Sequence, residues 1–145
     1  MASVFDAGGF SAQAGAAFTA ADVGKFLKWS SGQVVLCDTV GEQSIGVLAD
    51  HGAGAVGSPV EVHCGRVTKV RAGGALSVGA NIKTATTGKA SAASAAVTNT
   101  SDAGAASDAL IASFCMGTIH EAATADLDLV TAYIAPMGAI PTTAA

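Results

Sequence analysis

The stretch VEVHCGRVTKVR, Val60 to Arg71, governs the interpretation of the whole chain. The valines and the cysteine of VEVHC alternate with Glu61 and His63, which is the period of a half-buried β-strand. Gly65 interrupts the alternation, and we expect a bulge or bend there that returns Val67 to the buried side. The stretch therefore predicts a bent strand.

The same stretch brings together residue types that are common in catalytic and metal sites. His63 and Cys64 are neighbours, so in an extended strand their side chains leave on opposite faces and do not meet as base and nucleophile. We expect Cys64 to be a small buried hydrophobe and His63 to face solvent or an interface.

Short runs of β-branched and large apolar residues, separated by turn residues, predict strands along most of the chain. The predicted strands are Lys25–Trp29, Val34–Asp38, Ser44–Asp50, Pro59–Cys64 with its continuation to Arg71, Ala75–Ala85, Leu110–Ala122 and Leu127–Pro136. A motif of apolar, Gly, any, apolar, any, acidic occurs twice, in SIGVLAD (44–50) and CMGTIHE (115–121), and indicates two similar hairpins. Seven or eight strands of this kind predict an all-β fold, a small antiparallel sandwich or barrel.

The domain organisation follows from changes in composition. Residues 1–21 are rich in Ala and Gly with isolated aromatics and no sustained period, which predicts a flexible N-terminal arm. Residues 22–136 are predicted to form a single β domain. Within it, the Ala/Ser/Thr-rich range 90–109 predicts a long surface loop. Residues 137–145 are predicted to be a C-terminal tail.

The charge of the chain limits its partners. A net charge of −4 and a pI near 5.1 argue against nucleic acid, because phosphate binding needs a basic field. Charged residues make up 12% of the chain, about half the usual ~25%, which favours a surface covered by neighbouring subunits. The three cysteines are far apart and odd in number, which argues against a secreted disulfide framework.

Two further patterns suggest cofactors. The histidines His51, His63 and His120 could converge on a metal, but they lack ligand spacings such as HxxxH or HExxH. GAGAVG (52–57) matches GxGxxG, but it leads into a predicted strand at Pro59 instead of the helix that a dinucleotide needs. We therefore expect no catalytic residue, no metal and no cofactor, and predict that the chain is not an enzyme.

Four segments carry a resemblance to a known family: IGVLAD (45–50), GRVTKV (65–70), AGGALSVGANI (72–82) and TGKA (87–90). In their order, the chain from Val23 to Pro136 resembles the small capsid decoration, or cement, proteins of tailed phages. The range 90–109 and the C-terminal tail depart from that pattern.

The resemblance implies a homotrimer on the outer surface of an icosahedral phage head, at three-fold and quasi-three-fold positions. It would clamp neighbouring major capsid proteins and stabilise the head against internal DNA pressure, with no nucleic-acid or membrane partner. Independently of the family, spaced aromatics in the arm suit pocket filling by a strand that pairs through its backbone. The candidate contacts are Val4, Phe5, Phe10 and Phe18 in the arm and a polar patch of Arg66, Lys69 and Arg71.

Other functions remain open. A host-attachment or fibre-anchoring module would have a similar composition, and so would another virion part such as a tail protein. A small metalloenzyme would need a bound metal.

Overall fold

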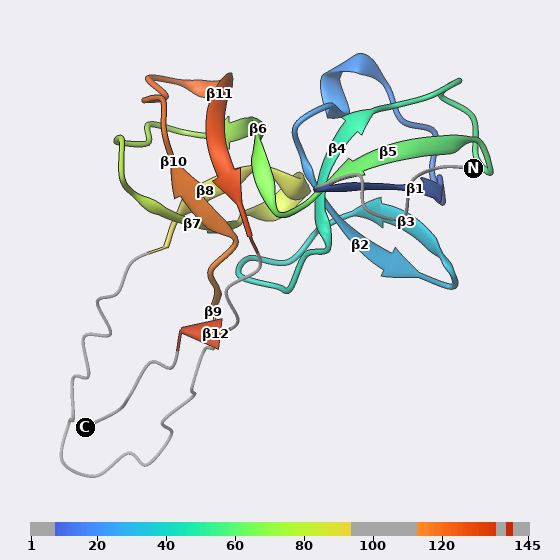
Figure 1. Cartoon of the computed structure of the whole chain (residues 1–145), viewed down its shortest axis with the longest axis horizontal. Coiled ribbons are helices and arrows are strands. Elements are labelled where there is room, and N and C mark those ends of the chain that lie inside the picture. Colours follow the sequence, from blue (N-terminus) through green and yellow to red (C-terminus); the bar gives the residue numbers. More distant parts are fainter. Residues whose placement is uncertain (1–7, 94–112, 136–138, 141–145) are drawn as a thin grey trace, which may run out of the picture.

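The computed structural model describes residues 8–93, 113–135 and 139–140. In this part of the chain all regular structure is β-strand apart from two 3-10 turns, so the predicted all-β class is confirmed. Figure 1 shows two neighbouring groups of strands with β6 (Arg66–Gly73) between them. We call them the N-terminal unit (residues 9–63) and the C-terminal unit (residues 66–134).

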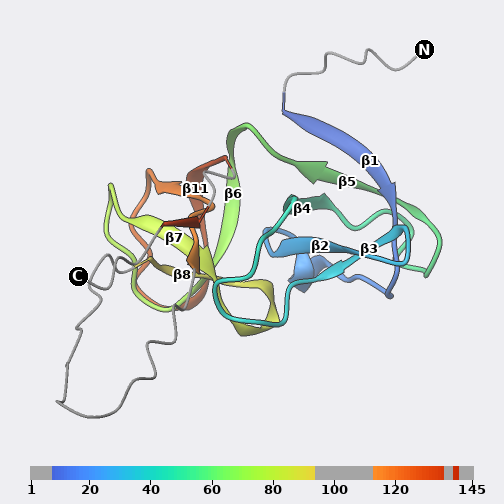
Figure 2. The same ribbon diagram turned by 90° about the horizontal axis from the view of Figure 1, so that it is seen from below.

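The N-terminal unit is a five-stranded sheet in the order β1-β5-β4-β2-β3. Its elements are β1 (Gly9–Gln13), the 3-10 turn η1 (Ala20–Asp22), β2 (Phe26–Ser30), β3 (Gln33–Leu36), β4 (Gly46–Asp50) and β5 (Pro59–His63). The sheet curls until its two edge strands touch, where Ala14 forms a parallel bridge with Val34. Figure 2 shows β1 and β5 side by side, with β2 and β3 across the unit from them.

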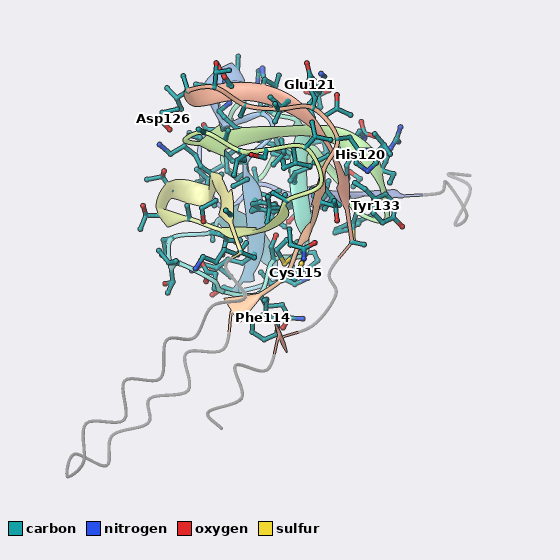
Figure 3. All side chains as sticks on the ribbon, turned by 90° about the vertical axis from the view of Figure 1, so that its left-hand side faces the viewer. Phe114, Cys115, His120, Glu121, Asp126 and Tyr133 are labelled. Carbon is teal, nitrogen blue, oxygen red and sulfur yellow. The ribbon has the colours of Figure 1, made fainter. Side chains whose placement is uncertain are left out.

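The C-terminal unit is a closed five-stranded barrel in the order β10-β11-β6-β8-β7. Its elements are β6 (Arg66–Gly73), β7 (Asn81–Thr84), the 3-10 turn η2 (Thr86–Gly88), β8 (Ala90–Ala92), β10 (Gly117–Ile119) and β11 (Asp126–Ile134). A separate pair of short strands, β9 (Ser113–Phe114) and β12 (Ala139–Ile140), lies beside it. In Figure 3, Glu121 and Asp126 lie at one end of this unit and Phe114 at the other.

The two units repeat one strand arrangement. The parallel contact Ala14–Val34 that nearly closes the first sheet corresponds to the parallel pair Ala72–Ala90 in the barrel. The remaining registers also correspond, strand for strand. The matching pairs are Phe10–Val62 with Thr68–Ala132, Leu27–Gly46 with Ile82–Gly117, Leu27–Leu36 with Ile82–Ala92, and Val47–His63 with Thr118–Tyr133. The internal repeat that the sequence motif indicated therefore extends over five strands of each unit.

Two buried clusters stabilise the fold. One lies inside the N-terminal unit and is formed by Ala12, Ala14, Phe18, Leu27, Val34, Leu48, Val60 and Val62. The other fills the barrel and includes Ile82, Met116, Ile119 and Ile134. Phe26, Cys37 and Val47 of the N-terminal unit belong to the barrel cluster, so the two units share apolar contact. Burial of this kind contributes about 25 cal/mol per Å² of apolar surface.

The opening stretch forms β5 and β6, with the bend at Gly65 (φ 71°). Val60 and Val62 are buried and Glu61 is exposed, as predicted. The prediction that Val67 returns to the buried side is wrong, because Val67 is 48% exposed and Val70 is the buried residue. The bend redirects the strand from one unit into the other without changing which alternate positions face inward.

Other segments differ in detail from the expectations. Residues 9–13 of the predicted arm form β1, and residues 1–7 lie outside the described part. The range 75–85 contains a turn before β7, so its predicted single strand is too long. Residues 90–92 of the predicted loop form β8, and residues 94–109 are outside the described part. Of the predicted tail, only β12 is described. In the described ranges, no helix has the length and apolarity of a membrane span.

Candidate functional site

One end of the barrel is covered by a loop of the N-terminal unit, residues 38–44. Thr84 is fully buried there, and its hydroxyl lies 3.1 Å from the Glu42 carbonyl oxygen and 3.3 Å from that of Thr39. The Gly41 N–H donates to the Thr84 carbonyl at 2.8 Å. Backbone and side-chain hydrogen bonds therefore attach this loop to β7.

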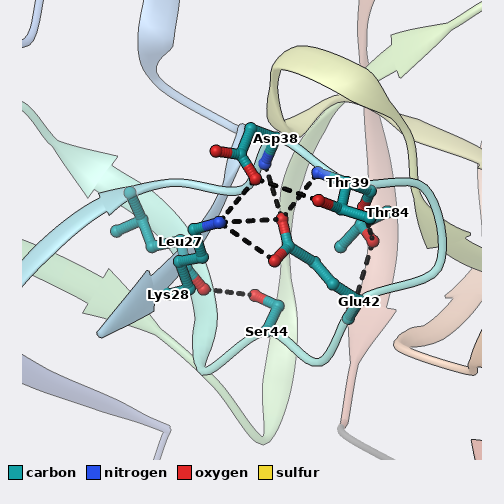
Figure 4. Close-up of polar contacts among 7 residues, drawn as sticks. All are labelled: Leu27, Lys28, Asp38, Thr39, Glu42, Ser44 and Thr84. Carbon is teal, nitrogen blue, oxygen red and sulfur yellow. Dashed lines mark hydrogen bonds and ion pairs between the residues drawn. The ribbon is translucent and has the colours of Figure 1, made fainter. Parts of the chain in front are cut away.

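Charged groups hold the covering loop in shape, as Figure 4 shows. The Lys28 ammonium lies 3.1 Å from Glu42 Oε2 and also contacts the Asp38 carboxylate. Glu42 Oε1 accepts the backbone N–H of Thr39 at 2.8 Å. The hydrogen bond from Lys28 lowers the pKa of Asp38, and the same bond raises the pKa of Lys28. This network fixes the loop whose hydrogen bonds with Thr84 join the two units.

The corresponding end of the N-terminal unit has no such cover among the described residues. When the two units are matched by strand register, Phe10 corresponds to Thr68 of the barrel and Trp29 corresponds to Thr84. Their rings stack with centroids 6.0 Å apart and an interplanar angle of 28°. Phe10 is 38% exposed and Trp29 is 53% exposed. This aromatic pair is the apolar surface next to the beginning of β1.

The other aromatics predicted as arm contacts lie elsewhere. Phe18 is 3% exposed and packs in the core of the N-terminal unit. Val4 and Phe5 fall outside the described residues. Of the predicted arm contacts, the structure thus presents Phe10 on the surface and brings Trp29, which the sequence did not single out, against it.

The predicted polar patch lies on β6, but two of its members bind within the chain. Lys69 pairs with Glu121 at 2.8 Å. Arg71 donates from Nε to the Val23 carbonyl and from Nη1 to the Leu127 carbonyl, both at 3.1 Å. Arg66 is exposed. The three side chains are spread along one strand, and Lys69 and Arg71 stabilise the β6–β11 ribbon.

Glu121 is the acidic residue that ends the second copy of the sequence motif, CMGTIHE (115–121). Its Oε2 accepts hydrogen bonds from Lys69 and from the N–H and hydroxyl of Thr131. The bond from Lys69, followed by those from Thr131, lowers the pKa of Glu121 to about 2.

The bend between β5 and β6 carries a row of three polar side chains. His63 Nδ1 lies 2.7 Å from the Thr68 hydroxyl, and His63 Nε2 lies 3.1 Å from Glu61 Oε1. Both imidazole nitrogens are thereby occupied, and the row ties β5 to β6 across the bend. Burial raises the pKa of the neighbouring Cys64 thiol, which disfavours the nucleophilic thiolate.

The remaining candidate sites from the sequence are the three histidines and the glycine-rich segment GAGAVG (52–57). His51, His63 and His120 do not come together, and the described residues hold no group of three or more His, Cys, Asp or Glu that could bind a metal. GAGAVG (52–57) forms turns between β4 and β5, and its Gly57 N–H donates to the Ala14 carbonyl at 2.7 Å.

Sequence reasoning missed Trp29, Glu42 and Thr84 as functional or junction residues. A signal existed for Trp29, because it is the single tryptophan of the chain and directly precedes the turn residues SSGQ, where strand ends are exposed. Thr84 and Glu42 gave no local signal, since their contacts join segments about forty residues apart.

Comparison with known proteins gives a structural match. No family model matches the chain, and no curated protein matches it significantly. Among solved structures, the chain is similar to one described as the head fiber gp8.5 N base of bacteriophage phi29, with 18% sequence identity and a TM-score of 0.57. The similarity covers 87% of this chain and 92% of that chain, so it spans both units.

Proposed function

We propose that the chain is a non-enzymatic structural protein of a bacteriophage virion that sits on the outer head surface and forms the base of a head projection such as a fibre. The supporting observation is the likeness of fold to the phi29 head fibre base across most of both chains. This favours the fibre-anchoring alternative over the cement role that the sequence resemblance placed first.

The proposed partners are the major capsid protein and further copies of the chain in a homotrimer. A chain with 12% charged residues and exposed apolar side chains on both units suits a protein covered by neighbours. Three linked copies would raise the effective concentration of each contact on the head. Sedimentation equilibrium of the purified chain tests the trimer, and a monomer at all concentrations would contradict it.

Antibody labelling tests the proposed location. Gold-labelled antibodies against the chain should mark the heads of purified virions of the phage that encodes it. Labelling of tails alone would overturn the head assignment and favour a tail component.

The cement role stays as the second candidate because of the sequence resemblance between Val23 and Pro136. The two roles differ in what the head loses without the protein. If the chain is a fibre base, heads lacking it lose their projections and release DNA at an unchanged temperature. If it is cement, such heads release DNA at a lower temperature, since a ligand of the intact lattice stabilises it by mass action.

A further inference from the structure

Strand β1 is one of the two edge strands of the N-terminal unit, and among the described residues no strand pairs with its side away from β5. It pairs with β5 over five consecutive residues without a register shift and meets β3 only at its end, through Ala14 and Val34. Natural sheets usually protect such an edge with Lys, Pro or a bulge. The strand GFSAQ (9–13) has none of these.

The direction of each backbone group along β1 follows from the hydrogen bonds at its two ends. The Cys64 N–H donates to the Gly8 carbonyl and the Ala14 N–H donates to the Ser58 carbonyl, both at 2.9 Å. In an antiparallel ladder the hydrogen-bonded positions alternate. Even-numbered residues of β1 therefore bond to β5. Gly9 and Ser11 direct their N–H and C=O groups, and Gln13 its N–H, toward the open side.

The barrel shows what occupies the equivalent position in the other unit. Arg71 of β6 corresponds to Gln13 of β1, and the Arg71 N–H donates to the Gly24 carbonyl at 2.8 Å. A segment of the neighbouring unit thus satisfies that edge of β6. In addition, Lys69 occupies the position that corresponds to Ser11, so this edge of the barrel also carries charge. The edge of β1 has neither the bound segment nor the charge within the described residues.

An apolar surface accompanies the open edge. The Phe10 ring lies on β1 itself and stacks on Trp29, and both side chains are more than one third exposed. The turn next to Trp29, Ser30–Gln33, is uncharged, as is the whole of β1. The exposed backbone groups fit an extended strand, and the two rings fit an apolar side chain of that strand. Charge lies beside the edge on β5 and β6, where Glu61 pairs with Ser11 and Arg66 lies next to Gly8.

We infer that the β1 edge binds an extended segment of another polypeptide, which pairs with the backbone of Gly9, Ser11 and Gln13 and places an apolar side chain against Phe10 and Trp29. This inference deepens the proposed function, because it assigns a contact on the head-bound protein to a strand donated by its partner. A synthetic peptide can test this inference before the natural partner is identified.

The direct test is a titration of the full chain, followed by nuclear magnetic resonance, with the uncharged peptide acetyl-Thr-Val-Thr-Val-Thr-amide. At millimolar peptide, the backbone amides of Gly9, Ser11 and Gln13 and the indole N–H of Trp29 should shift together. A peptide with Lys at the two Val positions should give at least tenfold weaker binding. Absence of shifts at these amides, or equal binding of the Lys peptide, would overturn the inference.

A matched pair of variants isolates the outward backbone donor. Ser11→Pro removes an N–H that points to the open side, and proline is tolerated on that side of an edge strand. Ser11→Ala changes the same side chain and keeps the N–H. We expect Ser11→Pro to reduce peptide affinity at least tenfold and Ser11→Ala to leave it within twofold, with unchanged circular dichroism in both. Equal affinities of the two variants would overturn the inference. If Ser11→Pro unfolds, Trp29→Ser, which should weaken binding at least threefold, replaces it in the comparison.

Three outcomes separate this inference from the proposed function and from self-association of the chain. If the peptide binds at β1 but the chain does not bind purified heads, the proposed function fails and the strand-binding edge stands. If the chain binds heads and the Ser11→Pro variant binds them equally well, the edge inference fails and the head location stands. If the same amides shift on raising the concentration of the protein alone, the occupant is a second copy and the inference of a foreign segment is overturned.

Discussion

The turns that lead into β4 and β10 have the same construction in the two units but use different chemical groups. Ser44 is buried, and its hydroxyl bonds to the carbonyls of Leu27 and Gly46 at 2.7 and 2.8 Å. Cys115 occupies the equivalent place, where its thiol lies 3.7 Å from the Gly117 carbonyl. We call the side chain that bonds to the backbone of this turn its polar cap. The cap is strong in the N-terminal unit, where it is the Ser44 hydroxyl, and weak in the barrel, where it is the Cys115 thiol.

The glycine two residues later does not differ between the units. Gly46 (φ 144°) and Gly117 (φ 151°) both approach the carbonyl of a neighbouring strand, and a Cβ would lie 2.4 Å from the His63 oxygen or 2.0 Å from the Tyr133 oxygen. The comparison teaches that this close approach requires glycine, whereas the cap before it can vary.

The largest predicted effect is on Gly117→Ala. The added methyl group would overlap the Tyr133 carbonyl, so strand β10 or β11 must move, and we expect a loss of about 4 kcal/mol of unfolding free energy. Gly46→Ala should lose a similar amount. Urea denaturation measures both.

Gly32→Ala is the matched control. Gly32 also has positive φ (79°), but a Cβ added there would meet no atom within 4 Å, so backbone strain alone lowers the unfolding free energy, by about 1 kcal/mol. Equal losses at Gly32 and Gly117 would mean that the close approach of strands does not matter.

The caps themselves give the next effect. Ser44→Ala leaves the buried Gly46 N–H without its hydroxyl acceptor and should cost about 2 kcal/mol. Cys115→Ala removes only a weak bond and a small apolar volume, and should cost about 1 kcal/mol. Thermal unfolding of the two variants checks the order. If the cysteine variant loses more, packing and not the polar cap distinguishes the units.

The cover over the barrel end gives a smaller effect. Thr84→Val keeps the shape of the side chain but removes its hydrogen bonds to the loop at residues 38–44, and should cost about 1 kcal/mol. Faster amide exchange of Gly41 would show that the loop has loosened. Thr86→Val, at an exposed position, should change neither quantity.

The sequence was informative where structure depends on local alternation. The buried valines of β5 and the Gly-containing sequence motif were correctly predicted, because strand period and glycine are local features. The phase of β6 was wrong, because a bend at Gly65 can redirect a strand without shifting its inward positions. The full correspondence of the two units was missed, since it is expressed in strand registers between distant segments and only one motif of it is visible in the letters.

The candidate surface was predictable in part for the same reason. Phe10 was named because an isolated aromatic in an Ala/Gly-rich segment stands out. Its partner Trp29 comes from a hairpin nearly twenty residues later, and the open edge of β1 depends on pairing with β5. Lys69 and Arg71 resembled an exposed basic patch because the sequence does not show Glu121 and the Leu127 carbonyl, which bind them.

The smallest predicted effect on stability concerns the acidic residue that ends each copy of the sequence motif. Asp50 accepts the Gly52 N–H of its own turn at 2.9 Å, whereas Glu121 joins β6 to β11. Because Lys69 and Thr131 lower the pKa of Glu121 from 4.5 to about 2, its contribution to stability is present above pH 4.5 and is lost as the pH falls toward 2.

The melting temperature of Glu121→Gln should therefore lie below that of the parent at pH 7 and approach it at low pH. Lys69→Gln should show the same pH dependence, and added salt should diminish both differences because the pair is half exposed. A difference that stays constant from pH 7 to pH 2 would mean that Glu121 acts through its shape and not through its charge.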